Sequence, residues 1–161
     1  MAYHGLDTYL NDHLAGATAG LNLAEAAADE HKQDEHGLFF GEIASDIKAD
    51  FATLESLMGD LAVDKSATKT AAAEIGSKVM KPKFTGDDDD LNAFVTLETL
   101  SIGIEGKCCM WKALRTVADG YPALGSLDID DLIARAEDQR SRIEAKRLEV
   151  SPNALAHSAP V

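Results

Sequence analysis

The sequence has few cysteines, few basic residues and no long apolar run. Its two cysteines are adjacent, at Cys108 and Cys109, in a chain of 161 residues. Neighbouring residues on a helix point about 100° apart, so this pair cannot form an ordinary structural disulfide. The composition therefore excludes a small secreted domain built on disulfides, and we interpret both thiols as small buried side chains.

Membrane and nucleic-acid functions are disfavoured by composition as well. No stretch approaches the ~18 consecutive apolar residues of a membrane span, and the first residues lack the basic-then-apolar pattern of a secretion signal. Fifteen basic against 28 acidic residues leave a net charge of −13, which argues against nucleic acid and anionic membranes as partners. We therefore expect an acidic, cytoplasmic protein that binds neither.

The spacing of the apolar residues is helical along most of the sequence. Apolar residues recur at spacings of three and four, the pattern of amphipathic helices, and no segment has a convincing strand pattern. Gly37 is predicted to separate the first two helices, and the aspartates of 87–90 to cap the third. The predicted long helices cover about 6–28, 40–61, 91–118 and 126–150, with a shorter helix at 67–79. We expect one domain over residues 1–150 and a flexible tail over 151–161, where prolines replace the periodicity.

The lengths of the connections predict how the helices are arranged. The first and last links are short, and short links join antiparallel neighbours. The middle link, about residues 62–90, is long enough to travel the length of a bundle and place the second and third long helices parallel. Short, long and short links in this order are typical of ferritin-like four-helix bundles.

A short motif adds a family resemblance to this connectivity. The opening Tyr9-Leu10-Asn11-Asp12-His13-Leu14-Ala15-Gly16 is similar to small bacterial ferritin-like proteins, and the chain resembles that superfamily over about residues 5–150. The resemblance implies an all-α four-helix bundle whose long crossover carries a short extra helix. It also implies a tendency to dimerise and a role in stress.

The ligand set of a ferritin-like di-iron site is incomplete in this sequence. Such a site takes a Glu from each of two helices and Glu-x-x-His from each of the other two. The second helix offers only Asp46 and Asp50, and the fourth has Arg140 and Arg147 where the ligand histidines would stand. A guanidinium does not lose its proton in proteins, so it cannot bind a metal. We predict no metal, no cofactor and no catalytic residue.

Charged residues spaced by seven predict what replaces the metal. Glu98, Glu105 and Lys112 share a stripe of the third helix, and Arg140 and Arg147 share one of the fourth; apolar residues flank both. The two helices are antiparallel about the turn at 121–122, so residues that face each other have residue numbers with nearly the same sum. This sum is the same for Glu98 with Arg147 and for Glu105 with Arg140, which places each glutamate opposite an arginine. We predict two buried or half-buried ion pairs in the interior.

Three functions remain open at this point. Asp50 and His13 add to the predicted interior polar cluster, and a wide apolar arc around Trp111 on the third helix predicts a dimer. The leading hypothesis is a non-catalytic bundle that acts as a homodimer or binds a protein partner. The alternatives are a metal-dependent oxidoreductase or metal-storage protein using Glu98, Glu105, Asp50 and His13, and a small-molecule binder with a cavity between its helices.

Overall fold

The computed structural model describes residues 4–65 and 88–156, and all regular structure in them is helical. The elements are α1 (His4–Glu30), α2 (Glu35–Asp60), α4 (Asp89–Val117), the 3-10 turn η1 (Ala118–Gly120), α5 (Pro122–Gly125) and α6 (Ile129–Leu155). The all-helical class predicted from periodicity is confirmed, while the predicted helix at 67–79 lies outside the described residues. No described helix is both long and apolar enough to cross a membrane.

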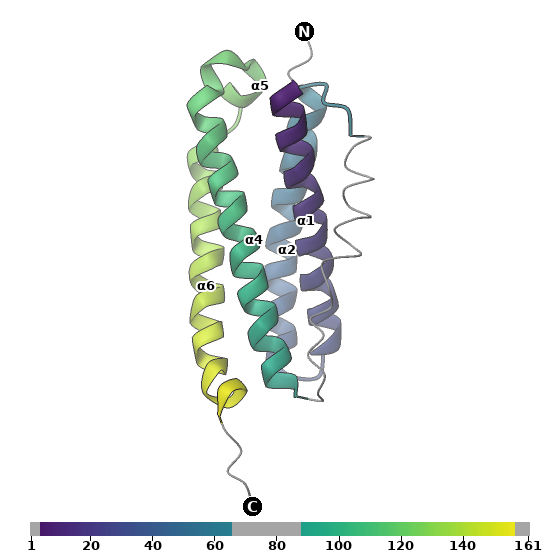
Figure 1. The fold of residues 1–161 in the computed structure, drawn as a ribbon, viewed down its shortest axis with the longest axis vertical. Helices are drawn as coiled ribbons and strands as arrows, with labels where there is room; N and C mark the ends of the chain where they lie inside the picture. The colour runs from purple at the N-terminus through teal and green to yellow at the C-terminus, as the bar shows by residue number, and fades with distance from the viewer. Residues whose placement is uncertain (1–3, 66–87, 157–161) are drawn as a thin grey trace, which may run out of the picture.

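The four long helices lie side by side along the long axis of the molecule (Figure 1). α1 packs on α2, α4 packs on α6, and α1 joins the two pairs by also packing on α4. α2 and α4 run in the same direction, and α1 and α6 run in the opposite one (Figure 1). α2 and α6 approach each other closely at only a few points of the backbone.

Aspartates cap the helices of the second half. The Asp88 carboxylate accepts a hydrogen bond of 3.0 Å from Leu91 N at the start of α4. Asp128 does the same for Asp131 N, also at 3.0 Å, at the start of α6. Such caps satisfy amides that lack a partner in the first turn, and their charge suits the helix dipole. Both predicted helix starts are confirmed.

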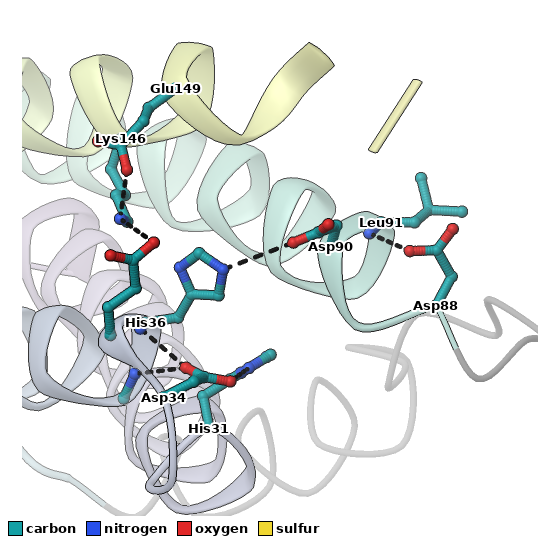
Figure 2. A network of polar contacts seen from close by, with 10 residues as sticks. His31, Asp34, His36, Asp88, Asp90, Leu91, Lys146 and Glu149 are labelled. Atoms are coloured by element: carbon teal, nitrogen blue, oxygen red, sulfur yellow. Dashed lines mark hydrogen bonds and ion pairs between the residues drawn. The ribbon is translucent and has the colours of Figure 1, made fainter. Parts of the chain in front are cut away.

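The turn between α1 and α2 differs from its prediction. Asp34, not Gly37, marks the break: its Oδ1 accepts from His36 N at 2.8 Å, and its Oδ2 lies 3.1 Å from His31 Nδ1 (Figure 2). Gly37 is the third residue of α2, where an added Cβ would stand 2.2 Å from the His31 carbonyl oxygen. A glycine is needed there because the backbone of the preceding turn comes so close.

The end of α6 also differs from its prediction. The helix continues five residues past Val150 to Leu155, so the predicted flexible tail is wrong for 151–155. Pro152 lacks an amide hydrogen and so removes one helical hydrogen bond. Val150 and Ala154 are nonetheless buried in the core, and this packing keeps the last turn helical. Residues 157–161 lie outside the described part.

The apolar arc of α4 is covered within a single chain. Leu97, Leu100, Ile104 and Trp111 are all buried against neighbouring helices, with α1 on one side of α4 and α6 on another. Ile102, at 70% exposure, is the main exception. The arc around Trp111 therefore does not by itself require a second subunit, and the dimer remains a prediction.

Candidate functional site

A cluster of charged and polar side chains is centred on a buried aspartate in the core. Asp50 of α2, 3% exposed, accepts hydrogen bonds at Oδ2 from Lys107 Nζ at 2.5 Å and Gln139 Nε2 at 2.9 Å. Gln139 Oε1 accepts a second bond of 2.5 Å from Lys107. Arg135 Nη2 lies 2.6 Å from Asp50 Oδ1 as an ion pair, with its N–H groups not aligned for a hydrogen bond. We call these four residues the Asp50 cluster.

The Asp50 cluster joins α2 to the α4–α6 pair, and the backbone of α2 comes close to those two helices at only a few points. Asp50 belongs to α2, Lys107 to α4, and Gln139 and Arg135 to α6. Burial lowers the pKa of Lys107, and the Asp50 carboxylate opposes that shift by favouring the ammonium form. With one anion facing two cations, the charge of Asp50 is balanced by protein groups alone.

The sequence predicted Asp50 as an interior group but missed the other three members. Lys107 follows Ile104 by three residues and precedes Trp111 by four, so it stands at a core position of an apolar repeat. Gln139 stands in the same relation to residues 136 and 143. A polar residue at such a position is the signal that could have found both. Arg135 offers no comparable signal.

The predicted ion pairs form, but at the surface. Arg147 Nη1 lies 3.3 Å from Glu98 Oε2, and Arg140 Nη1 pairs with Glu105 Oε2. The predicted register is therefore observed. Glu98 is 52% exposed, and Glu105 and Arg140 are 46% and 48% exposed, so the pairs are half-buried and the prediction of an interior position is wrong. The stripe lies at the outer edge of the α4–α6 contact, where long side chains pass the apolar layer to reach water.

Lys112 continues this surface stripe rather than the interior cluster. Its Nζ lies 3.0 Å from Glu137 Oε1, and both side chains are about half exposed. Arg147 also binds Glu144 at 2.8 Å, and its guanidinium lies over the ring of Phe94, 5.3 Å from the centroid. The Lys112–Glu137 pair and the Arg147–Phe94 contact hold α4 to α6, and the Arg147–Glu144 pair lies within α6. The carboxylates of Glu137 and Glu144 are therefore bound by protein cations.

His13 lies on α1, away from that stripe. Its ring packs edge-on against Tyr9, with ring centroids 4.6 Å apart. Burial lowers the pKa of His13, and the charge of Asp12 opposes the shift. The imidazole is therefore biased toward its neutral form.

The four ligands of the metal-binding alternative are not brought together. Asp50 and His13 line one cavity, whereas Glu98 and Glu105 reach outward to arginines of α6. Among the residues that the structure describes, no group of three or more His, Cys, Asp or Glu side chains has an arrangement that could hold a metal ion.

The cavity beside the Asp50 cluster has a volume of about 360 Å³ and lies between α1, α2 and α4. We call it the core cavity. Its α1 wall consists of small residues that include Gly16, Ala17 and Gly20, and its α4 wall includes Gly103 and Gly106. The remaining lining is largely aliphatic and aromatic. Such apolar enclosures with a few polar groups are the usual form of small-molecule sites.

The two cysteines lie in different environments. Cys108 is buried, as predicted, whereas Cys109 is exposed and its Sγ lies 3.7 Å from Glu105 Oε1. The prediction of two buried thiols is therefore wrong for Cys109. The reason is the angle of about 100° between neighbours on a helix, which turns one toward the core and the other away.

A second polar network closes one end of the molecule (Figure 2). His36 Nε2 of α2 lies 3.6 Å from Asp90 Oδ1 of α4, and Lys146 Nζ of α6 lies 3.9 Å from Glu35 and 2.7 Å from Glu149. These contacts link the starts of α2 and α4 to the last turns of α6. We interpret them as structural.

Comparison of the chain with protein-family models, curated proteins and solved structures gives no match. Its function is therefore inferred from the Asp50 cluster and the core cavity.

Proposed function

We propose that this chain is a non-catalytic ferritin-like bundle, with a long crossover between α2 and α4, that acts in the cytoplasm through association. It would form a homodimer or bind a protein partner, with a role in stress as the resemblance implies. The parallel direction of α2 and α4 and the pairing of α1 with α2 and of α4 with α6 support this topology.

The Asp50 cluster is the observation that carries the proposal. The central carboxylate, which a metal site would need free, is held by Lys107, Gln139 and Arg135. A divalent cation placed beside Asp50 would meet two protein cations within a few ångströms and be repelled by both. A buried ion pair of this kind serves to fix the arrangement of helices better than it serves catalysis.

Elemental analysis of protein purified without chelator tests the non-catalytic part. We expect no stoichiometric iron or manganese, and no rise in Tm when either metal is added, because Lys107 and Arg135 occupy the carboxylate. Stoichiometric metal that is lost in Asp50→Asn would overturn the proposal and favour the metal-dependent alternative.

Light scattering at micromolar concentration tests the association. A homodimer would have twice the chain mass of 17.2 kDa. A monomer would contradict the homodimer and leave only a partner protein of another kind.

A further inference from the structure

A strip of uncharged residues runs along the outward side of α4. Its six members follow one another at alternating spacings of four and three residues; they are Val95, Thr99, Ile102, Gly106, Cys109 and Ala113. This alternation is the spacing of a coiled-coil seam, along which one helix packs against another. We call these six residues the Ile102 strip.

The Ile102 strip is turned away from the core of its own chain. Four of its six members are exposed and two are partly exposed, and Ile102 keeps 70% of its surface accessible. The core uses the opposite side of α4, where Leu97, Leu100 and Ile104 are buried. Single exposed apolar residues need no explanation, but a row at the spacing of a seam does.

The polar atoms of the Ile102 strip already have partners within α4. The Thr99 hydroxyl donates to Val95 O at 2.9 Å, and the Cys109 thiol donates to Glu105 Oε1 at 3.7 Å. The strip therefore offers another molecule apolar contact rather than hydrogen bonds. A packed helix suits such a surface better than a polar ligand does.

Charge restricts the faces through which two copies of this chain can meet. Chains of net charge −13 repel each other, so a second copy fits best where charges are absent or already paired. The carboxylates that flank the strip belong to Glu98 and Glu105, and each is paired with an arginine of α6. The Ile102 strip and its flank toward α6 meet this requirement.

The order of side-chain sizes along the strip fits a second copy of the same strip. The first three members are β-branched and the last three are small. In an antiparallel pair, residues that face each other have residue numbers with the same sum, which places Ile102 opposite Gly106, Thr99 opposite Cys109, and Val95 opposite Ala113. A branched side chain then meets a small one at every level, as close packing of two helices requires. A parallel pair would set branched against branched and leave a gap at the glycine, and an unrelated partner helix would need no such symmetry.

The area around the strip is sufficient for a specific contact. At ~1.5 Å per residue the strip is ~28 Å long, and α4 with half of each flanking helix is ~20 Å wide. Each copy would bury ~550 Å², and the ~1,100 Å² of both exceeds the ~1,000 Å² expected of a specific interface. An interface at this lower end of the range should dissociate on dilution.

From these observations we propose that the chain forms a symmetric dimer in which the Ile102 strips of two copies pack antiparallel. Ile102 of each copy lies against Gly106 of the partner subunit. Both residues also line the core cavity, so the partner's α4 covers that wall of it. The inference rests on the homodimer of the proposed function and assigns it a surface.

A charge in the strip supplies the first test, read by sedimentation over a micromolar concentration series. Ile102→Glu should weaken the dimer by roughly a hundredfold or more, because the two-fold axis places two unpaired charges in the interface. Position 102 is exposed in the single chain, so the fold is retained. Leu38→Glu is the matched control: Leu38 is 73% exposed on α2, outside the strip, and the change should alter the dissociation constant by no more than about twofold.

An exchange of sizes tests the antiparallel register. Gly106→Ile sets two large side chains against each other and should weaken the dimer by roughly tenfold or more. Adding Ile102→Ala removes the opposing side chain and should recover most of that loss. An added Cβ at Gly106 meets nothing within 4 Å, and isoleucine favours helix over glycine, so both variants should fold, which circular dichroism checks.

Cys109 supplies a readout in the wild-type chain. Its thiol is free in the single chain and lies opposite Thr99 of the partner subunit in the dimer. Reaction with a thiol reagent should be immediate in dilute protein and should slow as the concentration rises through the dissociation constant. In Ile102→Glu the reaction should stay fast at every concentration.

Three results would overturn the inference, and each leaves a different part of the proposed function in place. A wild-type monomer at every concentration would mean that a different molecule covers the strip, and association with another protein would remain. A dimer that Ile102→Glu leaves intact would keep the homodimer but place its interface elsewhere. Failure of Ile102→Ala to rescue Gly106→Ile would rule out the antiparallel register. Metal analysis is independent of all three, so the non-catalytic part can fail separately.

Discussion

At the scale of single residues, depth decides how much an ion pair contributes. Asp50 and Lys107 are largely buried, so removing one charge leaves the other without compensation in the core. We expect Asp50→Asn to lower the free energy of unfolding by about 3–5 kcal/mol. The double variant Asp50→Leu, Lys107→Met should lose less than the two single changes together, because neither charge of the Asp50–Lys107 pair is stranded. It still loses the two hydrogen bonds of Gln139, whereas Arg135, at 37% exposure, can be solvated. Urea unfolding of the variants measures both effects.

The surface pair Glu105–Arg140 is the matched comparison. Both side chains are nearly half exposed, so Arg140→Ala should cost about 1 kcal/mol or less. A loss as large as that of Asp50→Asn would contradict the assignment of this pair to the surface.

His13 gives a prediction about pH. Burial, opposed by Asp12, lowers the pKa of His13 below its usual 6.5, so just below pH 6.5 the unfolded chain binds more protons than the folded one. Its contribution to stability is therefore complete above pH 6.5 and is lost as the pH falls through this window. The unfolding free energy of His13→Gln should decline less between about pH 7 and pH 5 than that of wild type. Parallel pH profiles would show that His13 is not the group responsible.

At the scale of elements, two glycines of α2 should respond to alanine in opposite directions. In Gly37→Ala the new Cβ would lie 2.2 Å from the His31 carbonyl oxygen, so the turn must shift, at a cost of about 1–3 kcal/mol. In Gly41→Ala the Cβ has open space, and alanine's helix propensity should add about 0.5–1 kcal/mol. Thermal or urea unfolding of the two variants separates these effects, and a shared sign would contradict the close approach at Gly37.

At the end of α2, glycine rather than alanine should be the stabilising residue. Ala62 has a φ of 55°, while its amide bonds to Gly59 O and that of Val63 bonds to Met58 O, which is the pattern of a Schellman cap. Glycine adopts this left-handed conformation without strain. Ala62→Gly should therefore raise the unfolding free energy by up to about 1 kcal/mol, despite the greater entropy of glycine in the unfolded chain. A lower midpoint in urea would argue against this cap.

These elements also show what sequence reasoning could and could not predict. The caps at Asp88 and Asp128 were predictable because capping depends on neighbours in the chain. The register of Glu98 and Glu105 with α6 followed from spacing alone. The exposure of these two side chains did not follow from spacing, because it depends on which side of α4 the other helices cover. Gly37 was misread for the same reason: its contact is with the returning backbone of the preceding turn.

At the scale of the whole molecule, the fold consists of two helical hairpins, α1–α2 and α4–α6. Two different kinds of helix contact join them. α1 and α4 pack closely but enclose the core cavity between small residues. α2 and α6 approach little, and the long side chains of Arg135 and Arg142 bridge them to Asp50 and Asp46. The core residues of all four long helices nonetheless form one continuous apolar cluster. Such a core should open as a unit rather than one hairpin at a time.

The two adjacent thiols can test that cooperativity. Cys109 is exposed and should react with a thiol reagent at once, at one equivalent per chain, whereas Cys108 is 2% exposed within the common core. In Cys109→Ser, labelling of Cys108 should require global unfolding, because no smaller opening uncovers a side chain packed in that cluster. Its rate should therefore depend on urea with the same slope as the unfolding free energy when reclosing is fast. Rapid labelling of Cys108 that does not depend on urea would mean that the α4–α6 hairpin opens alone, and that the Asp50 cluster does not join the two halves.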